Sequence, residues 1–256
     1  MLQYVDINCD MGEGFGPYTI GEDELMLSIA SSANLACGFH AGDFKIMAAI
    51  CRQAKANKVA VGAHPGYPDL WAFGRRHQDF SQAEIKQLLS YQIGAAAAMA
   101  KSEGHVLTHV KVHGALGHLV ADNESAAAAL IDTIKCIDRS LILTVMAGTS
   151  LQTMARDAGL KIAHEIYADR AYLENGRLVP RSQPGAVIHD AAIAAKRVLQ
   201  MVKENAIITE SGKRIAVNID TICVHGDTST AVEMARSVRQ LLEENSVTIA
   251  PFAERI

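Results

Sequence analysis

The sequence lacks the features that mark a disulfide scaffold, a membrane span or a nucleic-acid-binding protein. Its five cysteines are odd in number and include no C-x-x-C pair, which argues against a disulfide framework and a structural zinc knuckle. Apolar runs stay short of the roughly 18 residues that a membrane helix needs. The net charge is −4 and no basic cluster is longer than Arg75-Arg76, so we expect neither a nucleic-acid partner nor membrane association. No basic-then-apolar leader is present, and we expect a cytoplasmic protein.

Short motifs for nucleotide binding and serine catalysis are absent as well. Residues 211–214, SGKR, lack the upstream glycine and the final Ser or Thr of a P-loop. The glycines of GEGFG at 12–16 do not match a dinucleotide fingerprint, and no G-x-S-x-G elbow occurs. The cysteines are most simply small buried side chains, although Cys37, just before Gly38 and His40, could serve as a catalytic thiolate.

Short apolar runs alternate with amphipathic stretches along the whole chain, which is typical of β/α units and a parallel sheet. Seven or eight such units without a dinucleotide fingerprint favour a (β/α) barrel, closed or slightly irregular. At 256 residues, with no low-complexity stretch, the chain matches one barrel, and we expect a single domain over 1–256. The predicted strands are 2–9, 33–37, 58–62, 106–113, 141–146, 161–166 and 215–224, with a weaker one at 247–250. The predicted helices are 22–31, 44–57, 81–103, 123–138, 149–158, 190–205 and 228–245.

Four histidines share one position relative to the predicted strands: each ends an apolar run and is followed within two residues by glycine. Parallel strands open their C-terminal ends on one face, so these imidazoles should converge there as metal ligands or acid–base groups. Carboxylates follow three of them and could orient an imidazole, although two also stand where a helix N-cap is expected. The other six histidines lack this placement and are not expected in the site. The four histidines are His40, His64, His113 and His225; the carboxylates are Asp69 and the two possible caps, Asp43 and Asp227.

The first strand pattern, YVDINCDMGEGFG at 4–16, ends in carboxylates. Positions two apart share one face of a strand, so Asp6, Asn8 and Asp10 should point together into the barrel. Buried polar groups are costly unless paired or used, which indicates ligation, a general base or a hydrogen-bond network in which they satisfy one another. Glu13 follows between glycines, which let the backbone approach a ligand closely.

Basic residues that could hold an anionic group occur at three places. Lys111 should share a face with His113, and it either pairs with a carboxylate or binds an anion. Arg75 and Arg76 follow FG. The segment 167–189 interrupts the β/α rhythm with turn signals, and ENG at 174–176 suggests a small hairpin. This segment is either a lid or clamp over the site or a loop held together by an Asp–Arg pair; its charged residues include Asp169, Arg170 and Arg181.

Six motifs, in this order, resemble those of the LamB/YcsF family: DINCDMGEGFG, ANLACGFHAGD, GAHPGYPD followed by FGRR, KVHGAL, ADRAYLENGRLVPR and CVHGDT. The resemblance covers nearly the whole chain, from Asp6 to Asp227. The chain departs from the family pattern at Val112, where proline is usual, and at Gly117-His118, where Tyr-Asn is usual. Neither change removes an ionisable motif residue.

The resemblance implies a (β/α) barrel-like fold related to that of the polysaccharide deacetylases. It also implies ATP-dependent hydrolysis of 5-oxoproline (pyroglutamate) to L-glutamate. ATP, with Mg²⁺, would then be a co-substrate, and the B and C subunits of a 5-oxoprolinase would be the partners of this chain.

That activity suggests roles for the residues above. A lactam carbonyl is a poor electrophile, and phosphorylating its oxygen would activate it and explain the need for ATP. Lys111 and an arginine would steady anionic oxygens, and Asp10 or a strand-end histidine would serve as general base. The expected catalytic residues are Asp10, Glu13, His64, Lys111, His113 and Asp227. The expected substrate- or nucleotide-binding residues are Asn8, His40, Asp43, Arg75, Arg76, Asp169, Arg170, Arg181 and His225.

Two other functions fit the same residues. A metal-dependent amide or ester hydrolase acting alone would bind a divalent ion through Asp10, His40 and His64 and activate water. A lactam-binding or regulatory subunit would leave the chemistry to another protein. Stoichiometric zinc with ATP-independent amidase activity would favour the first, and ligand binding that survives loss of the strand-end histidines would favour the second.

Overall fold

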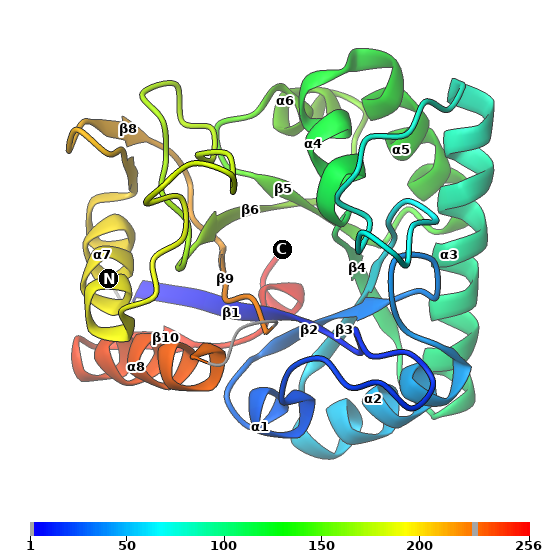
Figure 1. The fold of residues 1–256 in the computed structure, drawn as a ribbon, viewed down its shortest axis with the longest axis horizontal. Helices are drawn as coiled ribbons and strands as arrows, with labels where there is room; N and C mark the ends of the chain where they lie inside the picture. The colour runs from blue at the N-terminus through cyan, green and yellow to red at the C-terminus, as the bar shows by residue number, and fades with distance from the viewer. Residues whose placement is uncertain (1–2, 227–229) are drawn as a thin grey trace.

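The computed structural model describes residues 3–226 and 230–256 and has the expected parallel β/α architecture (Figure 1). The main sheet contains β1 (Gln3–Met11), β2 (Ser32–Ala36), β3 (Ala60–His64), β4 (Leu107–Val110), β5 (Ile142–Met146), β6 (Ile162–Tyr167), β9 (Thr221–Cys223) and β10 (Val247–Ile249). Its order is β10-β1-β2-β3-β4-β5-β6-β9, and β9 also pairs with β1. In the described part of the chain, the sheet therefore closes into a barrel of parallel strands, as predicted.

Strand β1 closes the barrel because it pairs with β9 along one edge and with β2 along the other. The first edge pairs with β9 at residues 6–8. The other edge pairs with β10 at residues 3–5 and with β2 from Asn8 to Met11, since the Val5 and Ile7 carbonyls point to the same side. Strand β10 thus lies outside the closed ring, which consists of β1 to β6 and β9.

Helices surround the barrel and cover its outer surface (Figure 1). Their buried faces are apolar; in the helix at 191–204, for example, Ala194, Val198 and Met201 are fully buried. Among the described residues, none of the helices combines the length and apolar character that crossing a bilayer requires. The helices are α1 (Asp23–Leu27), α2 (Phe44–Asn57), α3 (Gln82–Ser102), α4 (Gly114–Asp122), α5 (Glu124–Ile137), α6 (Ser150–Asp157), α7 (Ala191–Glu204) and α8 (Ala231–Glu244), followed by the 3₁₀ turn η1 (Phe252–Glu254).

Side-chain caps set two of the predicted helix starts. Ser81 and Glu84 form the expected capping box at α3. Asp43 accepts the backbone N–H groups of Lys45 and Ile46 and caps α2, which confirms its capping interpretation. The other predicted cap, Asp227, lies outside the described residues.

Two regions differ from the predicted elements. The strand predicted at 215–224 is divided into β8 (Arg214–Ala216) and β9, because β8 pairs antiparallel with β7 (Ala206–Ile208) in a separate sheet. Helix α4 was not predicted because Gly114 and Gly117 interrupt the apolar pattern that buries Leu116 and Val120. The hairpin expected at ENG is present, with Leu173 N–H donating to the Arg177 carbonyl.

The barrel has a polar interior and an apolar exterior. On β1, Val5, Ile7 and their alternate neighbours belong to the hydrophobic core, whereas Asp6, Asn8 and Asp10 face inward, as the alternation predicted. At the end where the strands begin, Phe252 of η1 packs against residues near the start of β5 and β6. The C-terminus accordingly lies at the centre of the barrel in Figure 1.

Gly62 of β3 has no room for a side chain, and we predict that Gly62→Ala destabilises the protein. A Cβ atom there would overlap the ring of the buried His109, which is bonded to Thr108 and Asn34. Because the packed ring must move, we expect the free energy of unfolding to fall by about 1–3 kcal/mol in urea denaturation.

Gly94→Ala is the matched control. Gly94 lies within α3, and a Cβ atom there would meet no heavy atom within 4 Å. Alanine favours the helix by about 0.5–1 kcal/mol, so this variant should be more stable than the parent. A Gly62→Ala variant as stable as the parent would contradict the packing of His109 against β3.

Candidate functional site

The four strand-end histidines converge on one face of the barrel, as predicted. His64 is the last residue of β3, and His40, His113 and His225 follow β2, β4 and β9 by four, three and two residues. The first three form one buried cluster. The fourth lies close to Asp10 and Cys223.

The three-histidine cluster is tightly packed. The rings of His40 and His113 stack with centroids 3.8 Å apart, and His64 meets His113 edge-on at 4.9 Å. Burial lowers the pKa of His40 and of His113 well below the ordinary value, and charge on neighbouring histidines acts in the same direction. These two rings are therefore neutral at physiological pH.

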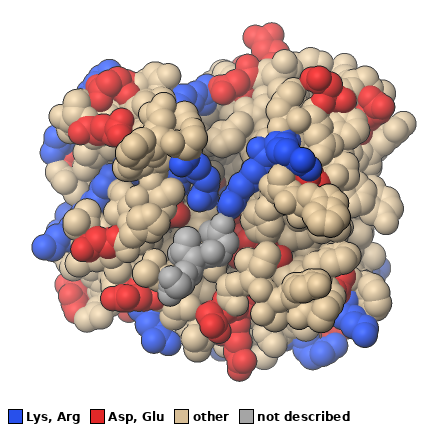
Figure 2. Space-filling view, viewed as in Figure 1, with Lys and Arg blue, Asp and Glu red and all other residues tan. Residues whose placement is uncertain are grey.

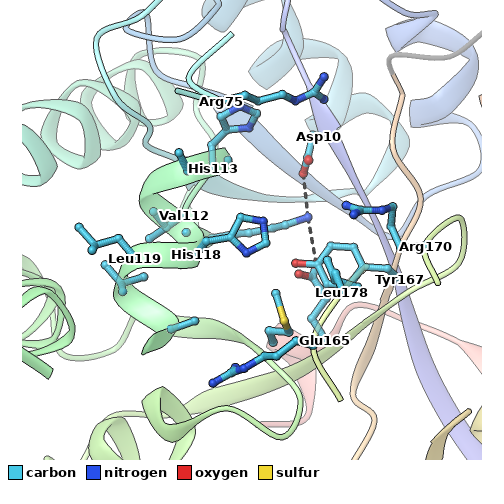
Figure 3. A pocket seen from close by; sticks show the side chains of 18 of the residues that line it. Asp10, Arg75, Val112, His113, His118, Leu119, Glu165, Tyr167, Arg170 and Leu178 are labelled. Atoms are coloured by element: carbon cyan, nitrogen blue, oxygen red, sulfur yellow. Dashed lines mark hydrogen bonds and ion pairs between the residues drawn. The ribbon is translucent and has the colours of Figure 1, made fainter. Parts of the chain in front are cut away.

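Next to this cluster, the Lys111 ammonium lies between the buried carboxylates of Asp10 and Glu165, two residues that Figure 3 labels. Its Nζ is 2.9 Å from Asp10 Oδ1 and 2.9 Å from Glu165 Oε1. Burial opposes the charge on Lys111, but Asp10, Cys223 and Glu165 hold its pKa well above the ordinary value. Burial likewise opposes the charge on Asp10, but His64 and Lys111 hold its pKa well below the ordinary value. Both groups are thus ionised at neutral pH.

Glu165 and Tyr167 are site residues that sequence reasoning missed. They occupy alternate positions of β6, and both line the cavity beside Lys111. The signal available was a glutamate inside an otherwise apolar predicted strand, which is costly unless the carboxylate has a partner. That partner comes from the end of β4, more than fifty residues away, and the sequence does not reveal it.

Hydrogen bonds continue from Asp10 into the barrel. Asn34 Nδ2 donates to Asn8 Oδ1 at 2.7 Å and to Asp10 Oδ1 at 2.9 Å. His109 Nε2 lies 3.0 Å from Asn34 Oδ1 and donates to it, because an amide oxygen only accepts. Burial lowers the His109 pKa to about 3, so the ring is neutral. Lys111 Nζ also donates to Asn8 Oδ1, at 3.1 Å. Asn8 therefore helps to position Lys111 from within the barrel.

His225 is oriented by Asp169 on another side of the cavity. Its Nδ1 lies 2.8 Å from both carboxylate oxygens, and its ring stacks on Tyr167. Burial opposes the charge on Asp169, but His225 holds the Asp169 pKa below its ordinary value. Because the carboxylate accepts, Nδ1–H donates, so Nε2 is the nitrogen that carries the lone pair whenever the ring is neutral.

The segment 167–189 forms part of the cavity wall and is held together by main-chain contacts. Arg170 donates from Nη2 to the Val179 carbonyl at 2.6 Å and from Nε to the Ala186 carbonyl at 3.2 Å. The predicted clamp thus contains one arginine that supports the loop itself. Arg181, by contrast, is exposed and lines the cavity.

These groups border a cavity of about 670 Å³ at the C-terminal ends of the strands. Figure 2 shows Lys and Arg side chains on two sides of the hollow at the centre of this face. The lining combines these cations and histidines with the carboxylates of Asp10, Glu13, Asp122 and Glu165, so an anionic ligand would be favoured beside the arginines. The basic lining residues are Arg75, Lys111, Arg170, Arg177 and Arg181.

Some predicted site residues do not line the cavity. Asn8 lies below it, Asp43 caps α2, and Arg76 forms an ion pair with Asp69. Asp227 falls outside the described residues. His40 does not line the cavity, but its ring stacks on that of His113, which does.

For His118 and Cys37, the structure indicates a different role from the one considered on the sequence. His118 of α4 lines the cavity, although it was not expected in the site; it could be placed only once α4 was known. Cys37 donates Sγ–H to the Leu35 carbonyl, and burial raises its pKa to about 12. Its thiol therefore stays protonated, which argues against a catalytic thiolate.

The chain is similar to known proteins over its whole length. Residues 5–256 match the LamB/YcsF family. The A subunit of the 5-oxoprolinase from Azorhizobium caulinodans is 51% identical over 249 residues, covering 97% of this chain and 98% of the relative. Its counterpart of the same name from Gluconobacter oxydans is 49% identical and covers 96% of each.

Solved structures agree with the fold. The lactam utilization protein from Thermus thermophilus has a TM-score of 0.91 at 44% identity, covering 97% of this chain and 99% of that one. The catalytic domain of a peptidoglycan N-acetylglucosamine deacetylase from Eubacterium rectale has a TM-score of 0.51 at 10% identity, covering 97% and 86%. The second likeness concerns the fold alone, and it confirms the expected relation to the polysaccharide deacetylase barrel.

The buried position of Lys111 leads to a stability prediction. Lys111→Met would leave two buried carboxylates without their cation, and we expect the free energy of unfolding to fall by about 3–5 kcal/mol near neutral pH. Without Lys111 the folded-state pKa of Asp10 would rise above its unfolded value, so proton uptake would return part of this stability as the pH falls. Urea denaturation at neutral and mildly acidic pH should show the deficit shrinking.

Lys86→Met serves as its control. Lys86 forms a 2.7 Å ion pair with Asp132, but both side chains are largely exposed. Its loss should change stability by about 1 kcal/mol at most. A Lys111→Met deficit as small as this, or one independent of pH, would contradict the buried ion pair.

Proposed function

Because the chain belongs to the LamB/YcsF family, we propose that it is the A subunit of a 5-oxoprolinase. In this proposal it acts with B and C subunits to hydrolyse 5-oxoproline to L-glutamate, with ATP and Mg²⁺ as co-substrate. The whole-length identity of about half to relatives of that name supports it. The structural observation that carries it is the cavity in which an ionised Asp10 and the oriented His225 lie close together and arginines contribute to the lining.

The cavity suits a small anion together with a second group. A volume of about 670 Å³ is typical of sites for drug-sized ligands and exceeds the needs of a five-membered lactam alone. In our proposal Arg75 and Arg181 bind the substrate carboxylate or a phosphoryl group through charge-assisted hydrogen bonds. The sequence has no P-loop, so the nucleotide is bound in an unconventional way or with the help of the B and C partners.

The proposed chemistry follows from the need to activate the lactam carbonyl. Transfer of the ATP γ-phosphoryl group to the carbonyl oxygen releases ADP and gives a more electrophilic carbon. Attack by water and cleavage of the ring C–N bond, with the proton going to the nitrogen, give an acyl phosphate with a free amine, and a second water hydrolyses it to glutamate and phosphate. Lys111 stabilises negative charge that develops on the oxygens. His225 takes the proton from water through Nε2 while Asp169 holds its Nδ1–H. Asp10 is the weaker candidate for the base, because its lowered pKa makes the carboxylate a poor proton acceptor.

One observation favours a second candidate, a metal-dependent amide hydrolase that acts alone. Glu13, His40, His64 and His113 bring four possible ligand atoms within 4.8 Å of one another. A metal ion can activate water directly, so such an enzyme would need no ATP. Hydrolysis of 5-oxoproline by the isolated chain without ATP would support this candidate.

The first test measures glutamate release from 5-oxoproline by this chain, alone and with its B and C partners, with and without ATP. We expect turnover only with partners and ATP together. His225→Asn should lower kcat by about a hundred- to ten-thousandfold, because the proton acceptor is lost while the shape of the site is retained.

Arg156→Ala is a suitable control, since Arg156 is exposed on α6 and does not line the cavity. It should leave turnover unchanged. Full activity of His225→Asn would exclude this histidine as the base. Absence of turnover in every combination, with a folded chain and proven partners, would reject the proposed function itself.

A further inference from the structure

Two ring nitrogens in the histidine cluster face each other at a short distance. His64 Nδ1 lies 2.8 Å from the Lys111 carbonyl, and His113 Nε2 lies 2.7 Å from the Phe73 carbonyl. A carbonyl oxygen only accepts, so both of these nitrogens carry hydrogen. The other nitrogens, Nε2 of His64 and Nδ1 of His113, lie only 3.0 Å apart, and Nε2 of His64 also lies 3.3 Å from Asp10 Oδ2.

His40 adds a third nitrogen to the same place. His40 is 1% exposed, yet neither of its ring nitrogens has a hydrogen-bond partner among the described residues. A buried imidazole in that state is destabilising, because its nitrogens have lost their hydrogen bonds to water. A Cβ atom at Gly66 would lie 2.7 Å from His40 Nδ1, and one at Gly74 would lie 2.8 Å from His40 Cβ, so the His40 side chain is tightly packed.

A carboxylate completes the group. Glu13 Oε1 lies 3.5 Å from His40 Nε2 and 3.7 Å from His113 Nδ1. In a tetrahedral site with metal–ligand bonds of about 2.1 Å, ligand atoms stand about 3.4 Å apart. The distances of 3.0, 3.5 and 3.7 Å in the cluster bracket that value.

We propose that Glu13, His40, His64 and His113 bind a divalent transition-metal ion, with Zn²⁺ the best match. Three imidazoles and one carboxylate suit Zn²⁺ better than Mg²⁺, which prefers oxygen ligands and retains water. The two carbonyl contacts supply the outer hydrogen bonds that metal-binding histidines commonly make, and they fix the ligating nitrogens of His64 and His113. The ligand set shares His40 and His64 with the set expected from the sequence and differs from it at Asp10, which is not among the four residues whose ligand atoms all lie within 4.8 Å of one another.

A proton shared between His64 and His113 is the competing explanation for their 3.0 Å separation. It would satisfy those two rings, but it would leave both nitrogens of His40 without a partner among the residues that the structure describes. A metal ion accounts for all three histidines together. The ion would border the cavity, because Glu13, His64 and His113 also line it.

The decisive measurement uses the isolated full-length chain, purified without chelators, and needs neither 5-oxoproline nor ATP. Elemental analysis should find stoichiometric metal. After chelator treatment, added Zn²⁺ should raise Tm, and added Co²⁺ should give the visible absorption bands of a four-coordinate site. Substoichiometric metal together with no response to either ion would overturn the proposal, whether or not the chain proves to belong to a 5-oxoprolinase.

A substitution at His40 distinguishes a histidine that binds metal from a buried histidine that has no partner. His40→Phe keeps an aromatic ring stacked on His113 but removes the nitrogens, so it should abolish bound metal and the rise in Tm with Zn²⁺. The control His189→Phe, at an exposed position before α7, should retain both. If His40→Phe instead binds Zn²⁺ as the parent does and is the more stable protein, His40 is not a ligand and the proposed site is wrong.

Discussion

The buried ion pair of Lys111 with Asp10 and Glu165 is the interaction on which the rest of the site depends. An ammonium inside a barrel is stable only if carboxylates compensate it, and each carboxylate is stable only while the ammonium remains. The three side chains come from β1, the end of β4 and β6, so their mutual attraction joins distant strands across the barrel. Lys111 also carries the carbonyl that orients His64, which links the ion pair directly to the histidine cluster.

The polar column beneath this pair explains how a barrel can hold charge at its centre. Asn8 and Asn34 place their side-chain amides between the charged groups, and Asp6 accepts hydrogen bonds from the Ser31 and Ser32 hydroxyls at the far end. Each buried polar atom named here has a partner on a neighbouring strand, which is what the low dielectric of an interior demands. The outer faces of the same strands are apolar and pack on the helices, so packing and chemistry use opposite faces of one sheet.

Particular residues show how far sequence reasoning reached. The strand-end histidines were predicted correctly because an apolar run followed by glycine reveals where a parallel strand ends, and all such ends meet on one face. The inward direction of Asp6, Asn8 and Asp10 followed from the two-residue period of a strand. Glu165 and His118 were missed because their roles depend on a partner or a helix that the local sequence does not reveal. The prediction of one long strand at 215–224 was wrong, because residues 214–216 pair antiparallel with 206–208 in a separate sheet and do not join the barrel.

The sequence by itself therefore determined the β/α order, the barrel class, the family and the face on which the ionisable groups gather, since these depend on periodicity and on local turn chemistry. Only the tertiary structure decided which groups pair. It separated Asp43, a helix cap, from Asp10, an ionised group of the cavity, and it placed Asp169 against His225. It also showed that two backbone carbonyls fix the protons of His64 and His113. Such choices depend on distances of a few ångströms between residues far apart in the chain, and burial makes each of those distances decisive for charge and for the position of a proton.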